Sequence, residues 1–193
     1  MPRFHAVDPQ HADPKAQPLL AAVQQALGVT PNMMRTMAVR PAVLDGYLAL
    51  NGALARGRLG RRAGEQVALA VAEVNGCTYC AAAHTLLGKG AGLTDADVEE
   101  ARAGTASEPR TAAALAFARA VVETRGHVTD ADLATARAAG LDDGDLAEVV
   151  AHVALNVFTN YFNSVADTEV DFPAVRAPRP RADGATPALA PSR

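Results

Sequence analysis

The chain has 193 residues, a formal net charge of -3 at pH 7, 4% aromatic residues and no tryptophan. A chain of this length can bury most of its apolar surface in one domain without disulfide bonds. The acidic balance and the lack of clustered basic residues argue against binding to nucleic acid or to an anionic membrane. No apolar run approaches the roughly 18 residues of a membrane span, and the N-terminus lacks the apolar core of a secretory signal. We therefore expect a cytoplasmic protein without a membrane or nucleic-acid partner.

Helical patterns follow one another along the chain, and no segment shows the alternation of a strand. Residues 1–17 are predicted to form an N-terminal arm, 18–173 a helical domain, and 174–193 a flexible tail rich in Pro, Arg and Ala. The abundance of alanine favours closely packed helices. The predicted fold class is all-α, a multi-helical bundle of about eight helices.

Proline, glycine and acidic residues mark where these helices begin and end. Gly28 is expected to end the first helix, and Thr30 to cap a second one that starts at Pro31. Two Thr-Asp-x-Asp segments, residues 94–97 and 129–132, have the acidic first turn of a helix N-terminus. Other helices are expected over residues 41–56, 61–74, 77–87, from 109, and over 145–167.

The two cysteines of the chain, Cys77 and Cys80, lie three residues apart, and His84 follows four residues after the second. At 100° per residue, a helix places all three within about 60° of one another, on one face. The two sulfurs are then close enough for a disulfide bond. We place Cys77 in the first turn of the helix, where free N–H groups and the helix dipole favour a thiolate.

A lowered thiol pKa gives only part of the reactivity that such a site needs. A shift from about 8.5 to about 6.5 raises the thiolate fraction at pH 7 from about 3% to about 75%. The lower nucleophilicity of the more acidic thiolate cancels roughly 6- to 10-fold of this roughly 25-fold gain. A positioned acid, worth about 10²–10⁴-fold, should matter more, and His84 suits this task. Glu65 and Glu73 are the candidates for a carboxylate that pairs with the imidazole of His84. The alternative for Glu65 is that it is a solvent-exposed residue without such a role.

Two other interpretations of this motif are open. The sequence Cys-x-x-Cys-x-x-x-His offers zinc three ligands, with a glutamate or His127 as the fourth. Alternatively, Cys77 and Cys80 are small core residues without chemistry. A redox-active dithiol is the hypothesis that we prefer, because two cysteines in one turn beside a histidine are hard to explain by packing.

Glu65, Cys77-Thr78-Tyr79-Cys80 and His84 resemble the E-x11-C-x-x-C-x3-H signature of the AhpD-like alkylhydroperoxidases, within the carboxymuconolactone decarboxylase superfamily. The flanking segments 31–48 and 154–173 are also similar to members of this family, so the resemblance covers about residues 18–173. It implies an all-helical fold and a trimeric or hexameric homo-oligomer. It also implies reduction of small-molecule hydroperoxides without a cofactor, through a disulfide that a dithiol protein reduces again.

The resemblance further implies individual roles. Cys80 would attack the peroxide, Cys77 would resolve the product, and Glu65 and His84 would form the proton relay. The dipole argument favours Cys77 as the more acidic thiol. The two views are compatible if Cys77, ionised through Glu65 and His84, helps to deprotonate Cys80. Tyr79 stands where the best-known peroxidase of this type has a second histidine, a departure that predicts lower peroxidase efficiency.

Two further functions remain alternatives. One is a lyase like the carboxymuconolactone decarboxylases, whose branch lacks the paired cysteines. The other is a zinc- or redox-sensing helical protein. Four polar residues also fall on the otherwise apolar last helix, where they either line a pocket, line a seam between subunits, or bond to neighbouring backbone. These residues are His152, Asn156, Thr159 and Asn160.

Overall fold

The computed structural model describes residues 2–178, and this part of the chain contains nine α-helices and no strand. The all-α prediction is confirmed, with one helix more than the expected number. None of the described helices is long and apolar enough to cross a membrane. The helices are α1 Gln17–Leu27, α2 Asn32–Met37, α3 Pro41–Leu54, α4 Gly60–Asn75, α5 Thr78–Gly90, α6 Asp95–Ala103, α7 Pro109–Thr124, α8 Asp130–Ala138 and α9 Asp143–Ala166.

Side chains of the predicted type begin most of these helices. Thr94 and Thr129 each form a capping box at the start of α6 and α8, and Asp142 forms a third at α9. In a capping box, the side chains of the N-cap and N3 residues satisfy backbone N–H groups that the helix leaves free. The prediction for α2 is wrong by one residue, because Pro31 and not Thr30 is the N-cap. Pro31 has ψ 149°, an extended conformation that keeps it outside the helix.

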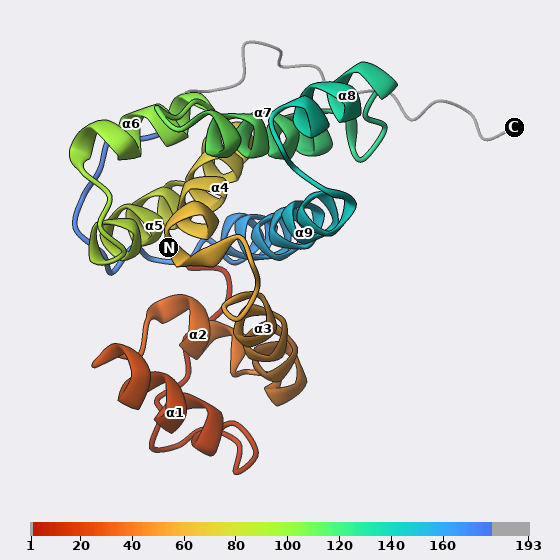
Figure 1. The fold of residues 1–193 in the computed structure, drawn as a ribbon. Helices are drawn as coiled ribbons and strands as arrows, with labels where there is room; N and C mark the ends of the chain where they lie inside the picture. Colours follow the sequence, from red (N-terminus) through yellow and green to blue (C-terminus); the bar gives the residue numbers. More distant parts are fainter. Residues whose placement is uncertain (1, 179–193) are drawn as a thin grey trace, which may run out of the picture.

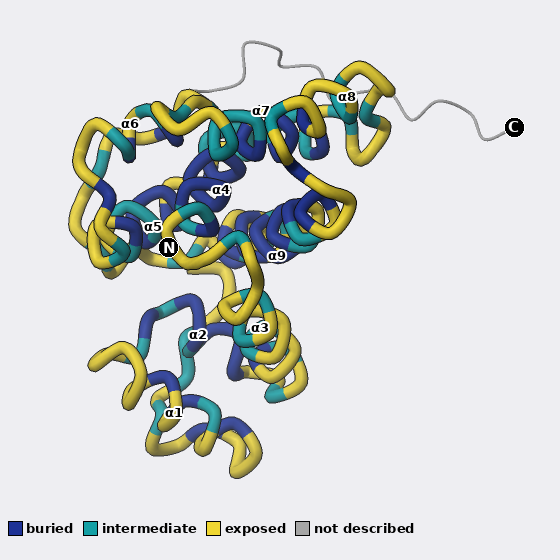
Figure 2. Tube along the Cα trace, in the orientation of Figure 1, coloured by how far each residue is buried: buried dark blue, intermediate teal, exposed yellow. Residues whose placement is uncertain are grey.

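The helices form two groups, with α1–α3 in the lower part of Figure 1 and α4–α9 in the upper part. Helix α4 is central, because it packs against α5, α6, α7 and α9. Residues 66–72 of α4 are consequently all buried, and Figure 2 shows this part of the helix in dark blue. A side chain on α4 can therefore reach several other helices.

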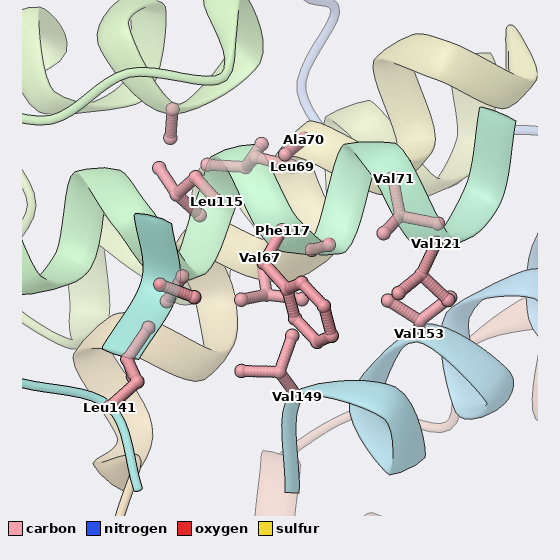
Figure 3. Packing of buried hydrophobic residues seen from close by; sticks show 14 of the residues in the cluster. Val67, Leu69, Ala70, Val71, Leu115, Phe117, Val121, Leu141, Val149 and Val153 are labelled. Atoms are coloured by element: carbon pink, nitrogen blue, oxygen red, sulfur yellow. The ribbon is translucent and has the colours of Figure 1, made fainter. Parts of the chain in front are cut away.

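The core consists of two clusters of different chemistry. The hydrocarbon cluster is built from α4 and α6–α9, and its labelled members in Figure 3 are aliphatic side chains and one phenylalanine. Its buried members are Val67, Leu69, Ala70, Val71, Leu93, Val98, Ala101, Ala114, Leu115, Phe117, Ala118, Val121, Ala136, Leu141, Leu146, Val149 and Val153.

The sulfur cluster lies where α1–α3 and the segment before α1 meet α5. Every sulfur atom of residues 2–178 belongs to it. Its buried members are Ala12, Ala16, Leu20, Val23, Met33, Met34, Met37, Ala38, Leu44, Ala72, Cys77, Tyr79, Cys80, Ala81 and Ala83.

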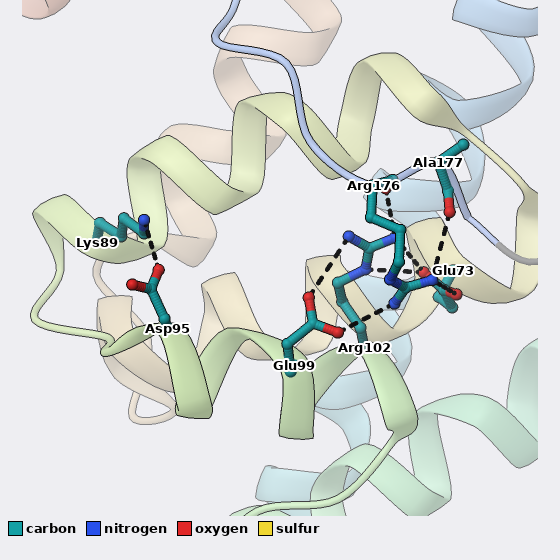
Figure 4. A network of polar contacts seen from close by, with 7 residues as sticks. All are labelled: Glu73, Lys89, Asp95, Glu99, Arg102, Arg176 and Ala177. Atoms are coloured by element: carbon teal, nitrogen blue, oxygen red, sulfur yellow. Dashed lines mark hydrogen bonds and ion pairs between the residues drawn. The ribbon is translucent and has the colours of Figure 1, made fainter.

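The segment after α9 is attached to α4 and α6 by a network of charges (Figure 4). Arg102 is buried, donates from Nε to Glu73 Oε2 at 2.9 Å, and donates from Nη2 to the backbone oxygen of Arg176. The side chain of Arg176 pairs with Glu73 and Glu99. Residues 179–193 of the predicted tail lie outside the described residues.

Before α1, backbone N–H groups make similar attachments. Those of Arg3 and Phe4 donate to the backbone oxygen of Ala166 in α9. The backbone N–H of Val7 donates to the backbone oxygen of Arg35 in α2. These bonds hold the first residues of the described chain against α2 and the end of α9.

Candidate redox site

The two cysteines lie directly after the turn between α4 and α5. Gly76 adopts the left-handed conformation, with φ 69°, which ends α4 and which glycine takes without strain. Cys77 is the N-cap of α5, so the prediction that it lies inside the first turn is wrong by one residue. Its sulfur accepts a hydrogen bond from the backbone N–H of Cys80 at 3.2 Å, in the manner of an N-cap side chain.

Cys77 and Cys80 form a disulfide bond, with their Cα atoms 5.3 Å apart. This separation lies inside the range of ordinary disulfides. Both residues are buried. The proximity that the Cys-x-x-Cys spacing predicted is thus present.

A cavity of about 260 Å³ opens beside this disulfide. Cys80 lines it, and Cys77 is not among the lining residues. Most of the wall is apolar and comes from α3, α4, α5, α9 and the segments around α2 and Phe172. Apolar residues of the wall include Leu27, Val29, Met33, Met34, Leu54, Ala68, Ala83, Leu86, Leu87, Leu155 and Phe172.

Glu65 of α4 and His84 of α5 meet in the wall of the same cavity. The carboxylate oxygen Oε2 of Glu65 lies 2.8 Å from Nδ1 of His84, and the two side chains are 16% and 22% exposed. The turn at Gly76 makes this contact possible, because it folds α5 back along α4. A carboxylate on Nδ1 orients the ring and leaves Nε2 as the nitrogen that exchanges a proton with a ligand.

Glu73, the other candidate carboxylate, lies in a different environment. Its Oε2 is bound by the buried Arg102 of α6, at 2.8 Å from Nη2. Glu73 therefore belongs to the charge network of Figure 4, whereas Glu65 accompanies His84.

Asn163 of α9 is a site residue that the sequence analysis did not identify. Its amide nitrogen Nδ2 donates to Cys80 Sγ at 3.4 Å and to Met33 Sδ at 3.2 Å. Asn163 is buried, and its Oδ1 has no hydrogen-bond partner. An amide N–H aimed at Cys80 would stabilise negative charge on that sulfur. The signal was present in the sequence, since Asn163 continues the polar spacing of Asn156 and Asn160 by one helical turn.

Two tyrosines border the cavity and stay protonated at neutral pH. The Tyr79 hydroxyl accepts a hydrogen bond from the backbone N–H of Met33 at 3.1 Å, and its ring contacts Phe172 edge-on at 5.4 Å. Burial raises the pKa of Tyr79 well above its usual range. Burial, with a smaller effect from the Glu65 charge, raises the pKa of Tyr47 to about 12. The hydrogen bond from Met33 to Tyr79 thus links α2 to α5, and both phenols stay uncharged at neutral pH.

The four polar residues predicted on the last helix are all buried. His152, Asn156 and Thr159 line the cavity. Asn156 and Thr159 also donate to backbone oxygens of α9, so the pocket and backbone-bonding alternatives both apply. Asn160 instead accepts a hydrogen bond from Asn75 at 2.9 Å, at the end of α4.

The geometry does not support the zinc alternative. Among residues 2–178, no group of three or more His, Cys, Asp or Glu side chains is arranged to hold a metal ion. The two sulfurs are bonded to each other and His84 is engaged with Glu65.

Residues 41–124 match the model of the Carboxymuconolactone decarboxylase family. The match covers less than half of the chain. The matched part contains Glu65, Cys77, Cys80 and His84, so the resemblance inferred from these residues is confirmed. No curated protein sequence matches the chain.

Solved structures share the family's helical fold with this chain. A peroxidase-related protein from Ralstonia eutropha JMP134, described as an alkylhydroperoxidase AhpD core, has a TM-score of 0.80 at 23% identity, over 88% of this chain and 92% of its own. A peroxidase-related protein from Silicibacter sp. TM1040 has a TM-score of 0.74 at 23% identity, over 85% and 90%. A cysteine-to-alanine variant of the debrominase Bmp8, in complex with 2,3,4-tribromopyrrole, has a TM-score of 0.71 at 21% identity, over 82% and 86%. At these identities the likeness establishes the fold alone.

Proposed function

We propose that the protein is a thiol-dependent peroxidase that reduces hydroperoxides through Cys77 and Cys80, with Glu65 and His84 as the proton relay. One observation carries this proposal. The cavity that Cys80 lines is also lined by the Glu65–His84 pair. A nucleophilic sulfur, a proton carrier and a space for substrate are thus combined in one place.

In the proposed reaction, the Cys80 thiolate attacks the terminal oxygen of the hydroperoxide and the O–O bond breaks. The alkoxide leaves as an alcohol after taking a proton from His84, and Cys80 becomes a sulfenic acid. The Cys77 thiolate then attacks Cys80 Sγ and forms the disulfide, while the sulfenic oxygen leaves as water. A dithiol protein returns two electrons and two protons by thiol–disulfide exchange.

The surroundings of each sulfur support this order of events. Cys80 borders the cavity and Asn163 donates to its sulfur, so a substrate and a charge-stabilising group both meet it. Cys77 lies at the N-terminus of α5 and its sulfur accepts a backbone N–H, an environment that favours a thiolate. An ionised Cys77 would suit both the deprotonation of Cys80 and the resolving step.

A second candidate function is reductive removal of halogen from an apolar ring. It is favoured by the size and apolar wall of the cavity, together with the fold that the chain shares with the debrominase Bmp8. The electron balance is the same: two thiols become a disulfide, carbon–halogen becomes carbon–hydrogen, and hydrogen halide is released.

Rapid mixing of the reduced protein with several hydroperoxides and with 2,3,4-tribromopyrrole separates the two functions. The peroxidase proposal predicts loss of two thiols per chain and one alcohol per peroxide consumed. Debromination without peroxide consumption would replace it with the second candidate. If neither the hydroperoxides nor 2,3,4-tribromopyrrole oxidises the thiols, both functions are wrong.

We also propose that the chain forms a homo-oligomer. Helix α9 exposes an apolar stripe on the side away from the cavity, formed by Val150, Phe158, Tyr161 and Val165, which are 40% to 58% exposed. Such a stripe is typical of a surface that a second subunit covers. Light scattering should give a mass well above 19.9 kDa. A monomer at micromolar concentration would contradict this proposal.

A further inference from the structure

Helix α9 contributes three polar side chains to the cavity wall that the proposed reaction does not use. His152, Asn156 and Thr159 are buried and lie at spacings of four and three residues, which is one face of a helix. Asn156 and Thr159 donate to backbone oxygens of their own helix. His152 differs from them, because its ring nitrogen Nε2 is buried and has no hydrogen-bond partner.

The nearest acid does not satisfy His152. Oε1 of Glu148 lies 4.0 Å from Nε2, which is beyond hydrogen-bond distance. The two oxygens of Glu148 already accept the backbone N–H groups of Arg58 and Leu59, at 2.9 Å each. The ring lies close to Gly64 of α4, where an added Cβ would be 3.1 Å from Cε1 of His152. A buried polar atom without a partner lowers stability, so its presence in a cavity wall points to a functional role.

The charge around His152 indicates what kind of group it can bind. Burial lowers its pKa, with a smaller opposing effect from Glu148 and Glu65 and a further lowering by His84. The imidazole is therefore neutral at pH 7, with one nitrogen that donates and one that accepts. The nearby carboxylates of Glu65 and Glu148 disfavour an anion. A neutral hydroxyl or carbonyl group fits this environment.

The size and wall of the cavity indicate the rest of the ligand. The volume of about 260 Å³ is several times the roughly 30 Å³ that a water molecule occupies, and it exceeds the roughly 150 Å³ of an apolar cavity that holds benzene. Leu54, Ala68 and Leu155 belong to its apolar wall. Hydrogen peroxide would leave most of this space unused.

We infer that the cavity binds an apolar, ring-sized molecule carrying a neutral hydroxyl or carbonyl group, and that His152 recognises this group while the reacting group faces Cys80. The orientation of the reacting group rests on the proposed function. The recognition by His152 does not, because it requires binding and no turnover. His152 would thus be a specificity-determining residue of the cavity.

Unreactive ligands test this inference on the disulfide form of the full chain. The probes are 4-isopropylphenol, isopropylbenzene and 4-isopropylbenzoate, which share one hydrocarbon body and differ in the group they carry. We expect the phenol to bind roughly 5-fold more tightly than isopropylbenzene, as for one added hydrogen bond. Equal binding of these two, or tightest binding of the benzoate, would overturn the inference.

The variant His152→Leu should lose the preference for the phenol and bind isopropylbenzene as the parent does. His152→Gln, which keeps a donor and an acceptor, should restore part of the preference. His127→Leu is the matched control, because His127 is exposed and does not line the cavity. A preference that survives in His152→Leu would contradict the role of His152.

If His152→Leu does not fold, an NMR titration of the parent protein still tests whether His152 contacts the ligand. Addition of 4-isopropylphenol should shift the imidazole NMR resonances of His152 more than those of His127, and no shift at His152 would overturn the inference. Failure of the peroxidase proposal would appear elsewhere, as absent peroxide consumption with the binding preference intact.

Discussion

The hydrocarbon cluster and the sulfur cluster are both buried, yet they differ in what their burial does. The hydrocarbon cluster consists of apolar side chains between α4 and α6–α9, and its contacts stabilise the fold without a polar side chain among its members (Figure 3). The sulfur cluster encloses a disulfide, three methionines and a tyrosine, and the cavity opens from it. Helix α4 belongs to both, and it presents Val67 to one cluster and Ala72 to the other.

This difference suggests a division of roles. Substitutions in the hydrocarbon cluster should change stability and leave the chemistry intact, whereas substitutions around the disulfide should change the chemistry first.

The largest effect is expected from the two sulfurs. Cys80→Ser should abolish peroxide consumption, because the attacking thiolate is gone. Cys77→Ser should permit one turnover that stops at a sulfenic acid on Cys80, detectable by mass spectrometry after trapping. If instead Cys77→Ser removes the first turnover and Cys80→Ser retains it, the two roles are reversed and the helix dipole decides which thiol attacks.

A substitution of Leu115 tests whether the hydrocarbon cluster affects stability alone. Leu115 is fully buried in α7, so Leu115→Ala should lower the free energy of unfolding by about 2–5 kcal/mol, through lost transfer free energy and the cavity left behind. The rate of cysteine oxidation in the folded protein should not change. Leu50→Ala, at a position 39% exposed, is the control and should cost far less in denaturant unfolding. A large loss of oxidation rate in folded Leu115→Ala would mean that the two clusters are coupled.

The relay should show a smaller but specific effect on rate. Glu65→Gln should slow oxidation of the cysteines by roughly 10-fold, and His84→Gln at least as much, which is at the low end for positioned acid–base groups. The double variant should be little slower than the slower single one, since both residues act on one proton.

Glu73→Gln is the matched control for this relay. It removes a carboxylate from the same helix, but one that is paired with Arg102, so stability should fall while the oxidation rate stays the same. Additive losses in the double variant would show that Glu65 and His84 act separately.

Tyr79→Phe should have the smallest effect on rate. Its hydroxyl accepts the N–H of Met33, so removing it leaves a buried donor unpaired and should cost about 1–3 kcal/mol of stability. The oxidation rate should change little, because the phenol is not the proton source. A large loss of rate in Tyr79→Phe would assign the phenol a direct part in the reaction.

Local signals in the sequence predicted much of the fold. The Thr-Asp-x-Asp segments specify caps that depend on a few neighbouring residues, and α6 and α8 begin where they predict. The start of α5 was missed by one residue, because cysteine is not among the side chains that usually cap helices.

The cavity could not be predicted in the same way. It depends on how α3, α4, α5 and α9 pack, and these contacts join residues far apart in the sequence. The polar residues of α9 illustrate the limit. Backbone bonding and cavity lining need the same residue types at the same helical spacing. The sequence alone therefore could not separate His152, which lines the cavity, from Asn160, which binds Asn75.

The central claim is that Cys77 and Cys80 act together as a two-electron donor to peroxide. Treating the fully reduced protein with one equivalent of hydroperoxide, followed by peptide mapping without reductant, tests it most directly. We predict one intrachain bond between Cys77 and Cys80 and no remaining free thiol. Two free thiols, or a sulfinic acid on either cysteine, would contradict the claim.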